Sequence, residues 1–200
     1  VNMATRRMVL LRSSRTGIFD DKKNINFEKI ICYSIGQGVK GLKCASKMLR
    51  PTSILTKKIA IAMSGGVDSS VCAYLLSKQH PTSSLIGVHM SNWTSFDAER
   101  CRQSEASWRL VKQTCAQLDI ECKNVSFEQD YVSDVFDPFV EKFQKHLTPN
   151  PDVSCNRLIK FGVLSRWVAE KYGSDALLAT GHYARLTPSY ELRAALDSSK

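Results

Sequence analysis

A short polar turn between two apolar runs is the first part of the chain that could do chemistry. The stretch AMSGGVDSSV at 62–71 follows an apolar run and precedes apolar residues at helical spacing. Gly65 and Gly66 allow backbone conformations in which several N–H groups converge on one anion, and the serines of the turn add hydroxyl donors. The positive end of the following helix faces the same place. The pattern predicts a phosphate-binding turn without the lysine of G-x-x-x-x-G-K-[ST], in which Asp68 binds a metal or holds the loop from behind.

A second polar segment, TPNPDVSCN at 148–156, places a carboxylate near a thiol. Asp152 stands three positions before Cys155, where a carboxylate can move a proton near a thiol. A thiol can carry sulfur or form a transient disulfide. On chemistry alone, a surface turn with an incidental cysteine explains this segment equally well.

Alternating strands and helices must position these two segments. The apolar patterns predict strands at 59–63, 84–90, 120–127 and 175–181, and helices at 69–79, 98–118, 131–145 and 158–172, with TPNPDVSCN in a loop and Gly173 closing the last helix. Such alternation with short links predicts an α/β fold with a doubly wound, mainly parallel sheet. Because ligands bind beyond the carboxyl ends of such strands, we expect the polar segments 64–70, 90–93 and 181–183 to meet there.

Basic residues gather at the start of the chain. Residues 1–58 hold thirteen Lys and Arg against three Asp and Glu, a balance of +10, whereas residues 59–200 carry −1. The stretch 3–19 is rich in Arg and Ser and has no acid, as is typical of a mitochondrial transit segment. A basic arm that touches RNA or an anionic surface is the alternative. We therefore expect a basic tail over 1–57, a folded domain over 58–200, and a mitochondrial location.

Seven cysteines are scattered along the chain, and no two have the C-x-x-C spacing of a zinc ribbon or an iron–sulfur site. Cys72 and Cys115 fall on apolar helical faces, where we expect them to be buried. These residues predict no metal site, and they fit a reducing compartment. No run approaches the roughly 18 apolar residues of a membrane span, so none is predicted.

Four motifs resemble those of one known family in their order and roughly in their spacing. They are MSGGVDSSV, GVHMSNW, TPNPDVSCNRLIKF and ATGHYAR. The string S-G-G-x-D-S-S after a strand is the signature of the PP-loop ATP pyrophosphatases, which have an adenine nucleotide alpha hydrolase-like fold. Residues 59–200 resemble the N-terminal part of the tRNA-specific 2-thiouridylases, the MnmA/TrmU family, in its mitochondrial type. The resemblance implies a tRNA-uridine 2-sulfurtransferase acting on the wobble uridine.

The resemblance implies ATP, with Mg²⁺, cleaved between its α and β phosphates so that AMP activates the uracil oxygen. Met90 would contact the adenine, with a core methionine as the alternative. Gly181 would let the backbone approach the nucleotide, and His182 could be a supporting polar group. Arg157 and Lys160 would contact phosphate, or are solvated helix charges. The implied ATP-binding residues are Ala62, Met63, Ser64, Gly65, Gly66, Val67, Asp68, Ser69, Ser70, Met90 and Gly181.

For the tRNA, the resemblance implies that Asn150, Pro151 and Asp152 surround the target uracil, which must leave its base stack. Asp152 would be the acid/base residue and Cys155 the catalytic thiol. Sulfur would arrive as a persulfide from a donor such as a cysteine desulfurase relay, and displace AMP. The thiol would form a disulfide with a second cysteine during turnover.

The chain departs from this pattern after Cys155, since no later residue is a cysteine. The run ELRAALDSSK at 191–200 resembles the family sequence just before a tRNA-contacting segment, so we expect a C-terminally truncated domain. Two alternatives follow. The chain could be another PP-loop ATP pyrophosphatase, such as a 2-thiocytidine synthetase or an amide-forming ligase, or a nucleotide-binding module without catalysis.

Overall fold

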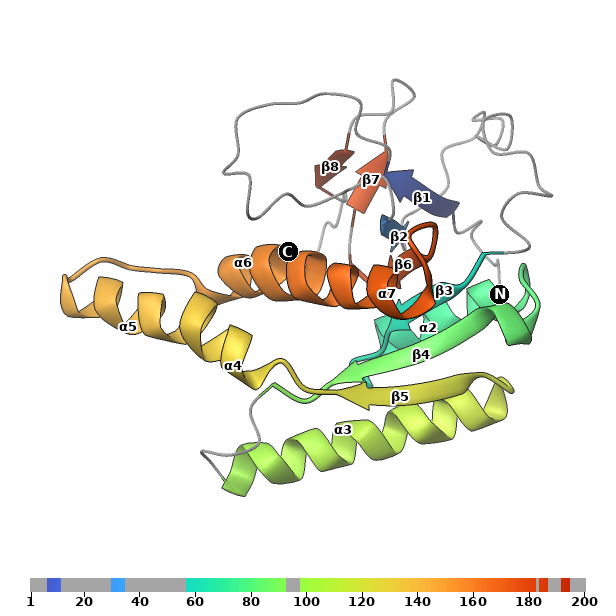
Figure 1. Ribbon diagram of the computed structural model, residues 1–200, viewed down its shortest axis with the longest axis horizontal. Helices are drawn as coiled ribbons and strands as arrows, with labels where there is room; N and C mark the ends of the chain where they lie inside the picture. Colours follow the sequence, from blue (N-terminus) through green and yellow to red (C-terminus); the bar gives the residue numbers. More distant parts are fainter. Residues whose placement is uncertain are drawn as a thin grey trace, which may run out of the picture.

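The computed structural model describes residues 7–11, 30–34, 57–92, 98–182, 184–186 and 192–194. Six strands form one sheet in the order β1-β2-β6-β3-β4-β5 (Figure 1). They are β1 (Arg7–Leu11), β2 (Ile30–Ser34), β3 (Ile59–Ala62), β4 (Leu85–Met90), β5 (Glu121–Val125) and β6 (Leu177–Thr180). Every neighbouring pair is parallel except β1 with β2. The predicted mainly parallel sheet is therefore confirmed.

Two of these strands lie in the segment that the sequence analysis assigned to a basic tail. β2 pairs with β6, with Ile30 opposite Leu178 and Cys32 opposite Thr180, and β1 pairs with β2. The count of charges concealed two short apolar runs, RMVLL and IICYS, that have the composition of strands. The sheet includes residues 7–11 and 30–34, while the transit role of the segment stays a prediction.

Helices cover both faces of the sheet (Figure 1). Ile59 and Ile61 of β3 pack on one face against α2 (Val67–Ser77) and α3 (Ala98–Gln117), whereas Ala60 packs on the other. The second face is covered by α4 (Glu128–Tyr131), the π-helical η4 (Val132–Phe136), the π-helical η5 (Cys155–Val163) and α7 (Leu164–Tyr172). The remaining elements are η3 (Thr82–Ser84), α5 (Asp137–Gln144), α6 (Pro151–Ser154), β7 (Ala184–Leu186) and β8 (Leu192–Ala194). The doubly wound arrangement is thus confirmed.

The small helical cysteines behave as predicted, because Cys72 of α2 and Cys115 of α3 are both buried in the first of these cores. Within the described ranges, no helix combines the length and apolar character needed to cross a membrane.

The strand order creates a switch point between β3 and β6. Strands β3, β4 and β5 follow one another across the sheet, and the chain then returns to place β6 on the opposite side of β3. The chain therefore leaves the carboxyl ends of β3 and β6 in different directions. In open α/β sheets this is where ligands bind.

The prediction of a loop at 148–156 is wrong from Pro151 onward, because α6 begins at that residue. Asn150 caps that helix: its Oδ1 accepts the N–H groups of Asp152 at 3.0 Å and Val153 at 3.3 Å. Proline suits the first position of a helix, where its missing N–H has no partner to lose. The Asn-Pro pair is the signal that the loop prediction overlooked. The helical path then continues to Gly173, which ends it with φ +99° as predicted.

Candidate functional site

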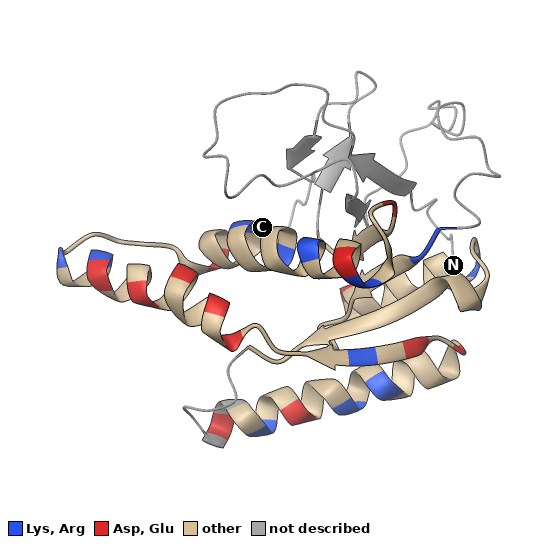
Figure 2. Cartoon of the chain, in the orientation of Figure 1, with Lys and Arg blue, Asp and Glu red and all other residues tan. Residues whose placement is uncertain are grey.

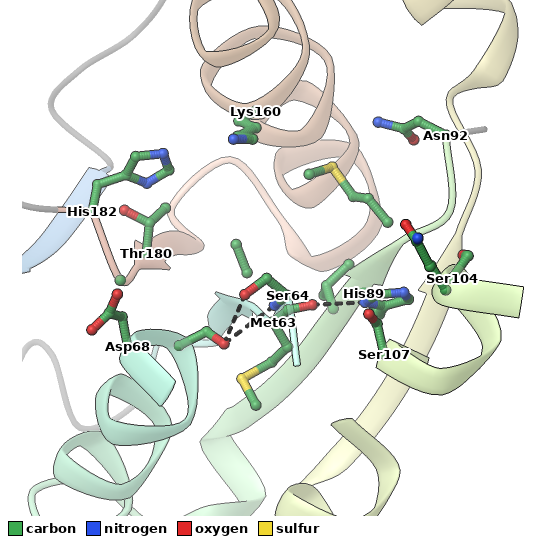
Figure 3. Close-up of a pocket in the computed structure, with 16 residues that line it drawn as sticks. Met63, Ser64, Asp68, His89, Asn92, Ser104, Ser107, Lys160, Thr180 and His182 are labelled. Carbon is green, nitrogen blue, oxygen red and sulfur yellow. Dashed lines mark hydrogen bonds between the residues drawn. The ribbon is translucent and has the colours of Figure 1, made fainter. Parts of the chain in front are cut away.

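A cavity of about 650 Å³ lies at the carboxyl ends of β3, β4 and β6 (Figure 3). Ser64 follows β3, Asn92 follows β4 and Gly181 follows β6, and all three lie on its wall. The first turn of α2, the middle of α3 and the middle of η5 complete the wall. The polar segments predicted to meet at this edge do so, except that residues 93 and 183 lie outside the described residues.

Gly65 sits where no other residue fits. Its φ is +81°, and a Cβ placed there would lie 2.8 Å from the backbone oxygen of Ser107 in α3. A positive φ is unfavourable for residues with a Cβ, and a backbone oxygen cannot turn aside as a side chain can. The glycine turn is therefore pressed against α3, which fixes its shape before any ligand binds.

The serines of the turn hold its backbone. The hydroxyls of Ser69 and Ser70 donate to the carbonyl oxygen of Gly66 at 3.0 and 2.9 Å. The Ser64 hydroxyl accepts the N–H of Gly66 at 3.2 Å. Because a hydroxyl has one proton, Ser69 and Ser70 do not have one left for phosphate in this arrangement. We had expected them to act as donors to the anion, whereas the structure uses them to shape the loop.

The first turn of α2 lies on the wall of the cavity. Its N-cap is Gly66, which has no side chain to bond the first turn, and the first backbone bond within the helix runs from Ser70 N–H to the Gly66 oxygen at 3.2 Å. Helix geometry leaves the N–H groups of a first turn without intrahelical acceptors, and the helix dipole adds positive potential. This end of α2 fits a phosphate group.

Gly181 allows β6 to end directly against this helix. A Cβ there would lie 2.9 Å from both the carbonyl carbon of Asp68 and the nitrogen of Ser69. The predicted close approach at Gly181 therefore exists in the structure between two backbone segments. The close approaches at Gly65 and Gly181 therefore hold the glycine turn from two sides.

Met90 lies half-buried on the cavity wall, next to a residue that the sequence analysis missed. His89 is 4% exposed, stacks on Trp108 at 5.8 Å between ring centres, and places its Nδ1 2.8 Å from the Met63 oxygen. A carbonyl at Nδ1 requires the proton there, so Nε2 of the neutral ring is an acceptor. Within the described residues this buried Nε2 has no hydrogen-bond partner. A ligand hydroxyl or amino group fits such an atom, and periodicity alone could not have revealed it.

The residues predicted to hold the target base lie apart from this cavity. Asn150 and Pro151 line a smaller depression of about 260 Å³, together with Phe139 and Lys142 of α5. Neither Asp152 nor Cys155 lies on the wall of the large cavity. Seven of the predicted ATP residues lie on the wall of the large cavity, namely Ala62, Met63, Ser64, Asp68, Ser69, Met90 and Gly181. Gly65, Gly66, Val67 and Ser70 belong to the same turn but do not line the cavity, and the predicted base residues lie outside it.

Cys155 is half-buried at the start of η5. Burial raises the pKa of its thiol, the charge of Lys160 lowers it, and the Asp152 carboxylate raises it, in decreasing order of size. The net direction is upward, so the protonated thiol is favoured. A thiolate at Cys155 therefore depends on the cation beside it.

Asn156 joins the surroundings of Cys155 to the large cavity. Its Oδ1 accepts the Lys160 ammonium at 2.8 Å and lies 3.2 Å from Nε2 of His182. Lys160 and His182 both lie on the cavity wall, and Phe161 packs on the His182 ring at 5.0 Å. Burial, and then the charge of Lys160, lower the pKa of His182. Figure 3 shows Lys160 on the helix opposite Met63 and Ser64.

Charge is unevenly spread over the helices of this face (Figure 2). Acidic side chains gather along α4, η4 and α5, and basic ones along η5 and α7. The acidic residues are Glu128, Asp130, Asp134, Asp137 and Glu141, and the basic ones are Arg157, Lys160, Arg166 and Lys171. Each group contains one residue of the opposite sign, Lys142 in α5 and Glu170 in α7. The η5–α7 side is therefore the better surface for a polyanion.

The strand, glycine turn and helix, set at the switch point of a doubly wound sheet, define a nucleotide-binding α/β domain of the PP-loop type. The chain belongs to the family whose model is described as the tRNA methyl transferase HUP domain, which matches residues 57–200.

Several named proteins resemble this chain. The mitochondrial tRNA-specific 2-thiouridylase 1 of Saccharomyces cerevisiae is 42% identical, over 68% of this chain and 34% of its own length. The tRNA-specific 2-thiouridylase MnmA of Chlamydia felis is 44% identical, over 67% of this chain and 36% of its own length. A solved structure, the U34-tRNA thiolase NcsA of Methanococcus maripaludis, has a TM-score of 0.42 at 27% identity, over 65% of this chain and 40% of that one. The chain spans about a third of the length of the curated relatives it matches.

Proposed function

We propose that this chain supplies the ATP-binding and thiol-bearing part of an enzyme that replaces oxygen 2 of the tRNA wobble uridine by sulfur. The observation that carries the proposal is the preformed anion site at the start of α2, where Gly65 is pressed against α3 and Gly181 against α2. The names of the relatives, which are tRNA 2-thiouridylases, support the choice of substrate.

ATP fits the large cavity in both size and chemistry. A volume of about 650 Å³ lies within the range of small-molecule sites. The phosphates would lie at the first turn of α2, and the adenosine would extend toward Met90 and His89 at the end of β4. Asp68 lies on the cavity wall, and its carboxylate is the kind of oxygen ligand that Mg²⁺ prefers. We include Mg²⁺ in the proposal for this reason.

The proposed reaction has three steps. The uracil oxygen attacks the α-phosphorus of ATP, a P–O bond forms, and pyrophosphate leaves onto the N–H groups of α2. The outer sulfur of a donor cysteine persulfide then attacks carbon 2 of the base, and AMP leaves with the original oxygen. The Cys155 thiolate next attacks the donor cysteine sulfur, so that the S–S bond breaks, 2-thiouridine is released and Cys155 forms a disulfide with the donor cysteine. Asp152 would move the protons of the base and the thiol, and Cys155 would take part in the sulfur transfer.

Asn150 has a structural task besides its proposed place near the base, since it caps the helix that carries Asp152 and Cys155. Pro151 fixes the first position of the same helix. The two residues would therefore act on the base partly by holding Asp152 in place.

The proposed partners are tRNA and a persulfide donor. The basic side chains of η5 and α7 offer the tRNA backbone a complementary surface close to Cys155. Relatives from Saccharomyces cerevisiae, Schizosaccharomyces pombe and Drosophila melanogaster are named as mitochondrial, and the start of this chain is basic. We therefore propose a mitochondrial location.

Methyl transfer is the second candidate, because the family description names it. An oxyanion site at a helix start suits cleavage of ATP at its phosphates, whereas transfer of a methyl group from a sulfonium donor does not require a held pyrophosphate. The proposed anion site at the start of α2 therefore favours thiolation over methyl transfer.

The deciding experiment incubates a full-length version of the enzyme, of which this chain is a part, with ATP, a persulfide donor and tRNA, and analyses both nucleotides and nucleosides by mass spectrometry. We expect AMP and pyrophosphate that depend on tRNA, and 2-thiouridine at the wobble position. Cys155→Ser should bind ATP with unchanged affinity and form no 2-thiouridine. ADP as the product, or a methylated uridine, would contradict the proposal.

A further inference from the structure

The π-helical winding of η5 changes which side chains lie near Cys155. In an α-helix, residues five apart point about 140° away from each other around the axis. In a π-helix the repeating bond joins residues five apart, so residue i+5 begins the next turn close to residue i. The π-helical segment runs from Cys155 to Val163, and Lys160 is five residues after Cys155. The winding therefore brings the Lys160 ammonium group to the side of the helix that carries the thiol.

The same winding brings Lys160 to the nucleotide cavity. Its Nζ donates to Asn156 Oδ1 at 2.8 Å, and Lys160 lies on the cavity wall. Phe161, five residues after Asn156, packs against His182, which is on the wall as well. The charge of Lys160 acts on both Cys155 and His182. Lys160 thus lies on the cavity wall and also acts on the Cys155 thiol.

Asp152 of α6 and Lys160 of η5 are the charged groups that act on Cys155, and Tyr131 of α4 packs in the same apolar core. His182 reaches the neighbouring Asn156 from the end of β6. Lys160 is the cation in this set, so the stability of a thiolate at Cys155 depends on where that ammonium group is engaged.

We propose that Lys160 is shared between the Cys155 thiolate and the phosphate of a nucleotide in the large cavity, so that each anion weakens the hold of the other on the same ammonium group. This inference rests on the proposed binding of ATP and adds an order of events to it. While a nucleotide phosphate engages Lys160, the thiol stays protonated and unreactive. When the phosphate leaves, Lys160 returns to the thiol and favours its thiolate.

Two variants separate this role from a structural one. Lys160→Met removes the charge and keeps most of the aliphatic chain, whereas Lys160→Arg keeps the charge and the bond to Asn156. Each is compared with the wild type in the 200-residue chain. Thermal unfolding followed by circular dichroism checks that both are folded.

The first measurement is the pH profile of Cys155 alkylation by iodoacetamide, read on the peptide that contains Cys155 by mass spectrometry. Without nucleotide, we expect Lys160→Met to slow alkylation about three- to tenfold at pH values below the profile midpoint. Loss of the neighbouring positive charge should raise the pKa of the Cys155 thiol by about half a unit to one unit. The midpoint should move to higher pH. Lys160→Arg should keep the wild-type midpoint, which a merely structural role would not predict.

The second measurement is ATP affinity by calorimetric titration. Linkage requires that a cation shared by two sites affects both, so Lys160→Met should also weaken ATP binding severalfold, and Lys160→Arg should not. A shift in the alkylation midpoint with unchanged ATP affinity, or weaker ATP binding with an unchanged midpoint, would overturn the sharing. If the wild type binds no ATP at all, the proposed function fails, and the alkylation profile still reports separately whether Lys160 acts on Cys155.

Discussion

Replacing Gly65 by alanine should impair ATP binding through the shape of one turn. At φ +81°, a residue with a Cβ is disfavoured by about 1–2 kcal/mol. The new methyl group would also lie 2.8 Å from the backbone oxygen of Ser107, and such overpacking typically costs about 1–3 kcal/mol. We therefore expect the free energy of unfolding to fall by about 2–5 kcal/mol, which leaves a domain in the middle of the usual range of about 5–15 kcal/mol folded.

Relief of that contact must move the turn away from α3, and the N–H groups that face the phosphates move with it. We expect the dissociation constant for ATP to rise at least tenfold, which corresponds to about 1.4 kcal/mol. The assay pairs urea unfolding with calorimetric titration of ATP under conditions where the variant is fully folded.

Gly173→Ala is the matched control. Gly173 also has a positive φ, +99°, but it ends α7, and its Cβ would meet only the Asp175 side chain, at 3.2 Å. We expect a stability loss of about 1–2 kcal/mol from the backbone alone and unchanged ATP affinity. If Gly65→Ala binds ATP as tightly as Gly173→Ala does, the reasoning about the turn is wrong.

Three further changes test other parts of the account. Gly181→Ala should weaken ATP binding, measured by the same titration, because its methyl group would meet the backbone of α2 at 2.9 Å; unchanged affinity would mean that this approach has no part in the site. His89→Phe should keep the stacking on Trp108 but lower the free energy of unfolding by about 1–3 kcal/mol, since the Met63 oxygen loses its donor; an unchanged urea midpoint would contradict this. The pKa of His182 is lowered by burial from 6.5, so its neutral form stabilises the fold above pH 6.5 and this contribution is lost as pH falls through the lower, folded value. His182→Asn should therefore flatten the decline of stability below pH 6.5, and a decline as steep as in the wild type would assign it to other groups.

The fold could be predicted from the sequence because its signals are local. The apolar runs of β3, β4 and β6 are short and bounded by polar segments, and α2 and α3 repeat their apolar residues at helical spacing. The glycine turn was predictable for the same reason, since Gly65 and Gly66 stand between a strand and a helix. These features depend on neighbours in the sequence.

What could not be predicted depends on contacts between distant residues. The 2.8 Å approach of Gly65 to Ser107 and the approach of Gly181 to α2 require the folded sheet. So does the bond from His89 to Met63. The π-helical winding that turns Lys160 toward Cys155 has no simple sequence signal. By contrast, the helix start at Pro151 could have been predicted from the preceding asparagine, and the prediction missed it.

The central claim is that the turn at 64–70 and the start of α2 bind the phosphates of ATP. The most direct test follows the backbone amide resonances of the isotopically labelled protein by NMR during titration with ATP and, separately, with inorganic pyrophosphate. The account predicts that both ligands shift the amides of Gly65 to Ser69, and that ATP alone also shifts those of His89 and Met90. Shifts confined to the basic residues before Lys58, with the turn unaffected, would contradict it.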